Sequence, residues 1–254
     1  MLLSEQMIKE GGWLFRWRSF LPLGLFVGEL IFLRHFQYIE DSQSWDEFWE
    51  VMTLGVSLLG VAVRMITVGS TPRRTSGRNR QHQVADELNT TGMYSLTRNP
   101  LYFGNALIWL GMALFAHSVM FFLAVLLICW VYHERIILTE EAFLSGKFGD
   151  AYRAWAAQTP VFVPKAKGWK TPSLPFSFRR ALRREYLGLF GVISGFTLLE
   201  LMAESHVHQA IWLGEGWITF WVTSLVLFLG IRVLAKATQF FSSPDEVRSS
   251  LPNS

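Results

Sequence analysis

At 254 residues the chain has the length of one domain or of a small pair of domains. Apolar residues make up 51% of it and charged residues only 17%, well below the roughly 25% of soluble proteins, so an ordinary soluble enzyme is excluded and a membrane protein is predicted. The formal net charge of +3 arises from Lys and Arg between apolar runs, which favours an orientation signal over nucleic-acid binding. The single cysteine, Cys129, excludes an internal disulfide and a cysteine-based zinc site.

Six apolar runs are candidates for membrane-spanning helices, because about 17–25 apolar residues cross a hydrocarbon layer of about 30 Å. The third and fourth runs are short and only His117-Ser118 separates them, which predicts a tight antiparallel helical hairpin. The fold class that we expect is all-α, a polytopic membrane protein with about six transmembrane helices. No cleavage-site pattern is found at the start, so we expect the first span to act as the targeting element. The six runs are residues 20–38, 48–68, 101–116, 119–137, 186–203 and 210–233.

The charges outside the runs predict the orientation in the bilayer. Basic residues gather before the first span, between the second and third, and before the fifth, whereas the first of the alternate loops holds acidic residues. By the positive-inside rule, we expect both termini and the two long basic loops to be cytoplasmic. The basic residues are Arg16, Arg18, Arg73, Arg74, Arg78, Arg80, Arg98, Lys165, Lys167, Lys170, Arg179, Arg180, Arg183 and Arg184, and the acidic ones are Glu40, Asp41, Asp46, Glu47 and Glu50.

Several charges lie inside predicted spans, where each costs about 2.5–3.5 kcal/mol at the bilayer centre on insertion scales. Glu29 lies in the first span and Arg64 in the second, at depths that differ by roughly 6 Å for a rise of about 1.5 Å per residue. A long arginine closes that gap, so we expect the two to pair across adjacent helices. The alternative is that Arg64 reaches the interface alone and Glu29 is protonated.

A polar cluster opens the third span. Pro100 suits the first turn of a helix and disfavours helix in the preceding residue, so Arg98 and Asn99 should lie at a helix N-terminus. Free backbone N–H groups and the helix dipole favour an anion there, and we expect a carboxylate or phosphate as the guest. The alternative is that Arg98 is only an interfacial anchor. Further donors nearby are Tyr94, Tyr102 and Asn105.

A second polar cluster, residues 133–135 followed by Glu140 and Glu141, begins at the end of the fourth span. The chain then continues as an amphipathic helix with apolar residues at steps of three and four, which we expect on the cytoplasmic side. Glu140 and Glu141 are adjacent and point about 100° apart on a helix, so at most one of them faces a given ligand. The other is expected to pair with Arg98 or Arg135, or to lie on the helix surface. Because the clusters bracket one hairpin, they can meet at the same membrane face.

The two clusters form linked motifs. The first reads Arg98-Asn99-Pro100-Leu101-Tyr102-Phe103-Gly104, and the second comprises Glu140-Glu141, Leu144, Phe148-Gly149, Tyr152, Trp155 and Pro160 to Pro164. In this order they resemble the isoprenylcysteine carboxyl methyltransferase family and its relatives among the phospholipid methyltransferases. On this basis we divide the chain into an N-terminal region with the first span (1–46), a methyltransferase-like core (47–165) and a linker with two C-terminal spans (166–254).

The resemblance implies an integral-membrane enzyme that uses S-adenosylmethionine, enclosed by the hairpin and the amphipathic segment. We predict Arg98 and Glu141 as catalytic residues: Arg98 holds an anion, either the cofactor's own carboxylate or the substrate's head group, and Glu141 orients polar groups of the cofactor. Asn99 stands where the family has histidine and does not titrate near neutral pH, so any acid–base role of that histidine is lost. The implied cofactor-binding residues are Tyr94, Arg98, Asn99, Pro100, Tyr102, Gly104, Asn105, Glu140 and Glu141.

Methyl transfer from a sulfonium is an in-line displacement with an activated reagent, so the protein mainly aligns the reacting atoms. A carboxylate or phosphate acceptor needs no general base, whereas an amine or thiol must first lose a proton. We expect a lipophilic acceptor, a carboxylate or lipid head group that enters sideways from the bilayer. A phospholipid amine, a thiol and a quinone-like phenol also fit the pattern, and the oligomeric state is open.

Two other classes of function fit the apolar runs. A membrane reductase of the sterol-reductase kind has similar C-terminal motifs but uses NADPH. A transporter or structural membrane protein would bind neither nucleotide, and the lack of paired broken helices weakens that interpretation. His206 and His208 lie near Glu204 and could contact a metal, but no further ligand cluster accompanies them in the sequence, so we predict an exposed loop and no metal site. No phosphate-binding or dinucleotide motif follows a strand-like segment, which excludes a soluble Rossmann-type methyltransferase.

Overall fold

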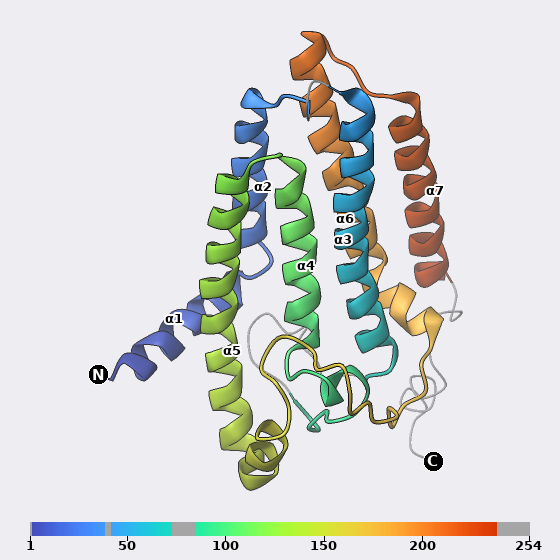
Figure 1. Cartoon of the computed structure of the whole chain (residues 1–254). Helices are drawn as coiled ribbons and strands as arrows, with labels where there is room; N and C mark the ends of the chain where they lie inside the picture. Colours follow the sequence, from blue (N-terminus) through green and yellow to red (C-terminus); the bar gives the residue numbers. More distant parts are fainter. Residues whose placement is uncertain (1, 39–41, 73–84, 238–254) are drawn as a thin grey trace.

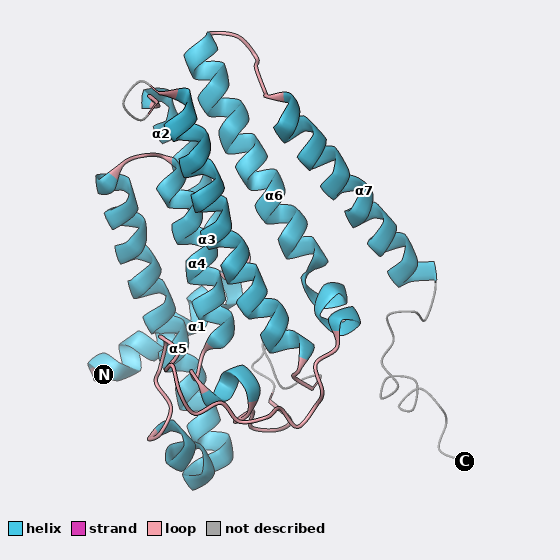
Figure 2. Ribbon diagram, turned by 45° about the vertical axis from the view of Figure 1, so that its right-hand side comes forward, coloured by secondary structure: helices cyan, strands magenta, loops and turns pink. Residues whose placement is uncertain are grey.

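The structure is a computed structural model that describes residues 2–38, 42–72 and 85–237, and its secondary structure over these ranges is entirely helical (Figures 1 and 2). The all-α class predicted from the sequence is thus confirmed. Two short 3-10 helices, η1 (Leu33–His35) and η3 (Gly92–Ser95), accompany the α-helices. In chain order the α-helices are α1 (Leu3–Trp17), α2 (Leu21–Phe32), α3 (Gln43–Gly69), α4 (Pro100–Phe115), α5 (Val119–Ala156), α6 (Phe178–His208) and α7 (Glu215–Ala237).

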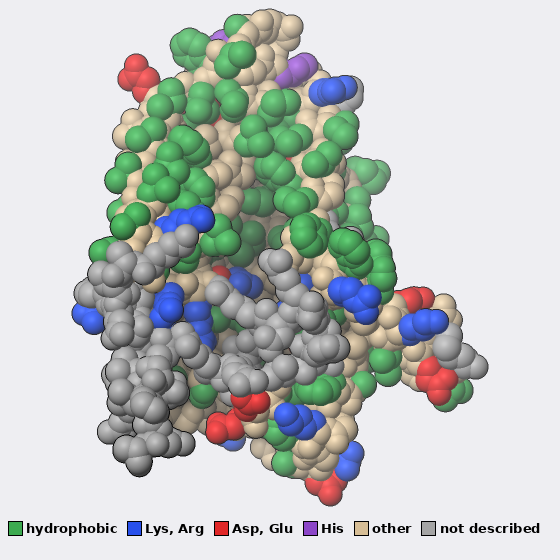
Figure 3. Space-filling model, turned by 180° about the vertical axis from the view of Figure 1, so that it is seen from behind, with side chains coloured by type: hydrophobic (Ala, Val, Ile, Leu, Met, Phe, Trp, Pro, Cys, Tyr) green, Lys and Arg blue, Asp and Glu red, His purple; other side chains and the backbone are tan. Residues whose placement is uncertain are grey.

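Four of these helices, α3, α5, α6 and α7, are long and apolar enough to cross a membrane. The helices α2 and α4 are also apolar but shorter, so the described residues support four full-length spans and two short apolar helices rather than six equal spans. The run at residues 20–38 falls short because α2 ends at Phe32, where η1 begins. Figure 3 shows hydrophobic side chains over the upper part of one face and Lys and Arg gathered below them, as expected for a membrane-embedded protein.

The predicted hairpin is present. The helices α4 and α5 are antiparallel, and three residues join them (Figure 1). In this turn His117 adopts a positive φ of 52°, and the Ser118 hydroxyl accepts a hydrogen bond from the Phe121 N–H at 3.3 Å. Beyond the apolar run, α5 continues to Ala156 as the predicted amphipathic helix. Gly149 interrupts it with φ 55° and ψ −126°, a conformation that glycine adopts without a steric penalty.

The helix α3 is central because α4 packs closely against one side of it. A Cβ atom added at Gly104 would lie 2.8 Å from the Gly60 carbonyl oxygen and 2.7 Å from Arg64 Cγ. Further along the same contact, the Ser57 hydroxyl donates a hydrogen bond to the Ile108 carbonyl at 2.9 Å. The two backbones approach each other this closely only because small residues face each other.

The predicted pairing of Glu29 with Arg64 is wrong. Arg64 forms a bidentate ion pair with Glu185 of α6, with Nε–Oε2 and Nη2–Oε1 distances of 2.9 Å, and its Nη1 donates to Asn105 Oδ1 at 2.6 Å. The helix α6 lies beside α3 and offers the whole carboxylate fork, which a guanidinium prefers. Glu29 is buried elsewhere, and its Oε1 has no hydrogen-bond partner among the described residues.

Three of the acidic residues assigned to the first alternate loop, Asp46, Glu47 and Glu50, belong to α3 instead, and Glu40 and Asp41 lie outside the described residues. Asp46 and Glu50 are buried in its first turns, opposite Glu200 and Glu204 of α6. The carboxyl groups of Glu50 and Glu200 lie within hydrogen-bonding reach of each other. The four acids thus form a buried cluster at the end of the bundle opposite to the start of α4.

The segment between α5 and α6, residues 157–177, lies at the lower end of the bundle in Figure 1. Its backbone is attached to η3, because Gly92 N donates to the Lys170 carbonyl at 2.8 Å and Lys170 N donates to the Ser95 hydroxyl at 3.0 Å. At the start of α6, the Arg180 and Arg184 guanidinium groups donate to carbonyls at the end of α3. Of the basic residues used for orientation, Arg73, Arg74, Arg78 and Arg80 lie outside the described residues.

Candidate active site

The two predicted polar clusters meet at the start of α4. The helix begins at Pro100, as predicted, and the preceding residues project beneath it toward the lower half of α5. Arg98 Nη1 lies 2.6 Å from Glu141 Oε1, and both side chains are mostly buried, at 15% and 26% exposed. The Arg98 Nε is buried and has no hydrogen-bond partner within the described part of the chain. This arrangement leaves one charged donor for an anionic ligand.

The residues that follow α5 close over this pair. The Arg98 N–H donates to the Pro160 carbonyl at 2.8 Å, and the Asn99 side-chain amide donates to the Val161 carbonyl at 2.9 Å. The buried Thr97 hydroxyl donates to the Phe162 carbonyl at 2.8 Å. Residues 160–164, the proline-bounded segment, are therefore fixed against the start of α4. The side-chain amide of Asn99 has a definite partner at the position where the family that the motifs resemble has histidine.

Glu140 faces a different partner from Glu141, as their 100° separation on the helix requires. The Tyr102 hydroxyl donates to Glu140 Oε1 at 2.8 Å, and Arg18 Nη1 lies 3.8 Å from the same oxygen. Arg18 follows α1, which packs against α5 with Gly11 on the Arg135 backbone (Figure 1). No sequence motif pointed to a functional role for Arg18, which was used only as one of the orientation charges.

The other predicted residues divide between this site and the α3 contact. Tyr94 lies in η3, and its carbonyl accepts a hydrogen bond from Trp155 Nε1 at 3.3 Å. Burial raises the pKa of the Tyr94 phenol well above its usual range, so the hydroxyl is a neutral donor. Gly104 and Asn105 instead face α3, where Arg64 binds the Asn105 amide oxygen.

His133 is a buried candidate that the motifs did not single out. Its Nδ1 lies 2.8 Å from the Cys129 carbonyl oxygen, and its Nε2 is buried with no hydrogen-bond partner among the described residues. Aromatic rings from α4, α5 and the proline-bounded segment surround the imidazole, with centroid distances of 5.1–5.7 Å. These rings are Tyr102, Trp109, Tyr132 and Phe162.

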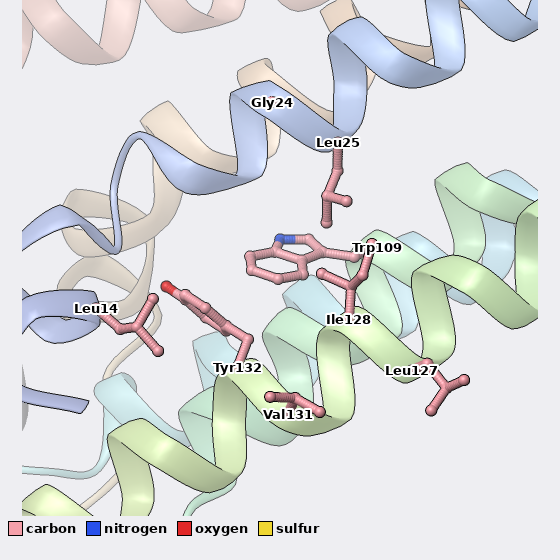
Figure 4. A pocket seen from close by; sticks show the side chains of 8 residues that line it. All are labelled: Leu14, Gly24, Leu25, Trp109, Leu127, Ile128, Val131 and Tyr132. Atoms are coloured by element: carbon pink, nitrogen blue, oxygen red, sulfur yellow. The ribbon is translucent and has the colours of Figure 1, made fainter. Parts of the chain in front are cut away.

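An apolar groove of about 540 Å³ lies beside this aromatic group, between α1, α2, α4 and α5 (Figure 4). The Trp109 and Tyr132 rings form part of its lining, and exposed Leu127 and Val131 lie along its α5 side. The Tyr132 hydroxyl donates to the Arg18 carbonyl at 3.3 Å, which links the groove to the Glu140 site. The groove has the character expected for an apolar chain. The remaining lining residues are Leu14, Gly24, Leu25 and Ile128.

Within the described ranges no three His, Cys, Asp or Glu side chains are placed to hold a metal ion. His208 instead lies next to Glu204, with Nε2 and Oε2 3.2 Å apart. Of the groups near Arg98, its Nε, the Tyr94 and Tyr102 hydroxyls and the two glutamates have the chemistry to hold a charged organic cofactor.

Comparison with known proteins places these elements in a family. Residues 52–151 match the phospholipid methyltransferase family, a segment that includes the start of α4, the hairpin and both glutamates. The chain is 29% identical over 161 residues to the cobalt-zinc-cadmium resistance protein of Cupriavidus metallidurans, covering 61% of this chain and 72% of that protein. It is 30% identical over 169 residues to the nickel-cobalt-cadmium resistance protein of Alcaligenes xylosoxydans, covering 63% of this chain and 76% of that protein.

A third relative is the protein-S-isoprenylcysteine O-methyltransferase of Schizosaccharomyces pombe, which is 29% identical over 121 residues. That match covers 46% of this chain and 50% of the yeast enzyme. No solved structure matches significantly. The chain is similar to the yeast isoprenylcysteine methyltransferase, and its apolar helices make it a membrane-embedded protein. It belongs to the phospholipid methyltransferase family.

Proposed function

We propose that the chain is an S-adenosylmethionine-dependent methyltransferase that methylates a lipophilic acceptor taken from the bilayer. The observation that carries the proposal is the Arg98–Glu141 pair at the start of α4, with a buried Arg98 Nε that has no partner among the described residues. The pair lies inside the segment that matches the phospholipid methyltransferase family.

The residues present fit this cofactor. Its carboxylate suits Arg98 Nε and the N-terminus of α4, where both the charge and the free N–H groups favour an anion. Glu140 and Glu141 supply negative charge near a sulfonium, and the neutral Tyr94 phenol supplies a hydrogen-bond donor. When bound, the cofactor supplies an activated methyl group. The protein then has to exclude water and align the acceptor.

The groove beside Trp109 and Tyr132 supports lateral entry of the acceptor's apolar part, because it opens among exposed apolar side chains. We place the site on the cytoplasmic side, together with both termini, since Arg98 and the arginines at the start of α6 lie at the same end of the bundle.

Isothermal titration calorimetry in detergent tests the proposal with S-adenosylhomocysteine and, separately, NADP⁺. We expect binding of the first and none of the second. Arg98→Ala should weaken binding about 10- to 100-fold, the effect of about 1.5–3 kcal/mol for a lost charged hydrogen bond. Arg153→Ala is the matched control, because Arg153 is 63% exposed and, among the described residues, forms an ion pair only with the exposed Asp150. Binding of NADP⁺ alone, or unchanged affinity in Arg98→Ala, would overturn the proposal.

A further inference from the structure

We infer that His133 is a general base that takes a proton from the methyl acceptor, so that the acceptor carries a neutral hydroxyl or thiol on an apolar chain. This inference rests on the proposed function and specifies its acceptor class. It differs from the carboxylate or lipid head group expected from the sequence.

The hydrogen bond of Nδ1 determines which ring nitrogen of His133 carries the proton. A backbone carbonyl only accepts hydrogen bonds, so the 2.8 Å contact between Nδ1 and the Cys129 carbonyl places the proton on Nδ1. The neutral imidazole then presents an unprotonated nitrogen at Nε2. The Cys129 sulfur lies 3.3 Å from Nδ1, on the same side of the ring, and does not contact Nε2 in this arrangement.

The position of Nε2 points to a ligand. His133 is 2% exposed and its Nε2 has no hydrogen-bond partner in the described ranges, which is uncommon for a buried polar atom. No carboxylate is found in contact with this nitrogen among the described residues, and four aromatic rings surround the imidazole instead. A neutral O–H or S–H group satisfies the nitrogen in such surroundings, whereas a carboxylate or phosphate offers it no proton.

The apolar groove reaches this group through shared side chains. Trp109 and Tyr132 line the groove, and the centroids of their rings lie 5.3 and 5.1 Å from that of His133. The Tyr102 ring centroid lies 5.7 Å from that of His133, and the Tyr102 hydroxyl donates to Glu140 in the candidate cofactor site. His133 thus contacts residues of both the groove and the cofactor site. A shift of the Trp109 or Tyr132 ring exposes Nε2 to a head group whose chain occupies the groove.

The step balances without a further reagent. The acceptor's O–H or S–H bond breaks and its proton passes to His133 Nε2. A lone pair of the oxygen or sulfur forms a bond to the transferred methyl carbon. The carbon–sulfur bond of the sulfonium breaks, and its electron pair stays on the cofactor's sulfur, which becomes neutral. The imidazolium carries the positive charge and returns the proton to solvent after the product leaves.

Methyl transfer from labelled S-adenosylmethionine is measured with para-dodecylphenol, dodecanethiol and dodecanoate as probes. We expect transfer to the phenol or the thiol and none to dodecanoate. His133→Phe keeps an aromatic ring but removes the nitrogen, and should lower the rate about 10²- to 10⁴-fold, the usual contribution of a general base. With a para-dodecylphenol that carries nitro groups on both ortho positions, which is already ionised at neutral pH, the loss should shrink to within about tenfold, because no proton has to be removed. His117→Phe, in the turn at the opposite end of α4, is the matched control and should keep the wild-type rate.

A binding measurement provides a readout independent of turnover. Calorimetry with S-adenosylhomocysteine present compares para-dodecylphenol with para-dodecylanisole, which has no hydroxyl proton. Wild type should bind the phenol about tenfold more tightly, and His133→Phe should lose this preference. His133→Gln should keep the preference, since its amide oxygen accepts a hydrogen bond, but should lose the rate, since an amide does not take up the proton.

Three outcomes would overturn the inference: methylation of dodecanoate in preference to the phenol and thiol, equal binding of phenol and anisole by wild type, or a folded His133→Gln that turns over normally. A protein that fails to bind S-adenosylhomocysteine would instead remove the proposed function. The two failures are thus distinguishable.

Discussion

Replacing Glu185 by alanine is expected to destabilise the protein more than any surface change. The bidentate pair with Arg64 joins α3 to α6, and Glu185 is only 3% exposed while Arg64 is 21% exposed. Without the Glu185 carboxylate, the mostly buried Arg64 guanidinium keeps only its hydrogen bond to Asn105 among the three that are described above. Loss of one partner from a buried pair costs about 3–5 kcal/mol, and at about 2–4 °C per kcal/mol the midpoint of thermal unfolding should fall by about 6–20 °C.

Thermal unfolding in detergent, followed by tryptophan fluorescence, measures this shift. Glu134→Ala is the matched control, because Glu134 is 44% exposed and pairs at the surface with Arg135, so its loss should cost about 0–1 kcal/mol. Glu29→Gln should be neutral or stabilising, since one oxygen of Glu29 has no partner in the described structure. A Glu185→Ala shift no larger than that of Glu134→Ala, or a large loss in Glu29→Gln, would refute this account of the α3–α6 contact.

Three further changes test other contacts. Gly104→Ala should lower the free energy of unfolding by about 1–3 kcal/mol, because its Cβ would lie 2.8 Å from the Gly60 carbonyl oxygen. Denaturant titration measures this loss, and a folded variant of unchanged stability would argue against the close approach of α3 and α4. Glu200→Gln should maintain or raise thermal stability, because it removes a buried carboxyl from a cluster of four, and a clear decrease would show that its charge is needed. Burial raises the pKa of Tyr94 in the folded state, so its contribution to stability is fully present below its unfolded-state pKa of about 10 and is lost as the pH rises through its folded-state pKa. In melting curves recorded at several pH values, Tyr94→Phe should therefore lose less stability above pH 10 than wild type does. An unchanged dependence on pH would contradict the burial of Tyr94.

Helix and turn geometry predicted those parts of the site that depend only on residues close together in the sequence. Pro100 fixed the start of α4, and the two residues between the apolar runs required a tight turn. The angular separation of Glu140 and Glu141 implied different partners, and the structure gives them Tyr102 and Arg98. These features follow from helix geometry alone and need no knowledge of which helices are neighbours.

The features that the sequence did not reveal depend on how helices pack. Arg64 pairs with Glu185 because α6 lies beside α3, although more than a hundred residues separate the two in the chain. Arg18 reaches Glu140 only because α1 folds back onto α5. His133 likewise stood out only once the rings of α4 and the proline-bounded segment were seen around it. Hydropathy also counted the run at residues 20–38 as a span, although α2 ends at Phe32, since hydropathy does not show where a helix ends.

Photolabelling with an azido derivative of S-adenosylmethionine, followed by mass spectrometry of the digested protein, shows whether the segment around Arg98 and the segment around Glu141 form one cofactor site. We expect labelled peptides from residues 92–105 or 140–164, and excess S-adenosylhomocysteine should suppress the labelling. Suppressible labelling confined to α2, α7 or the acidic end of the bundle would contradict this expectation.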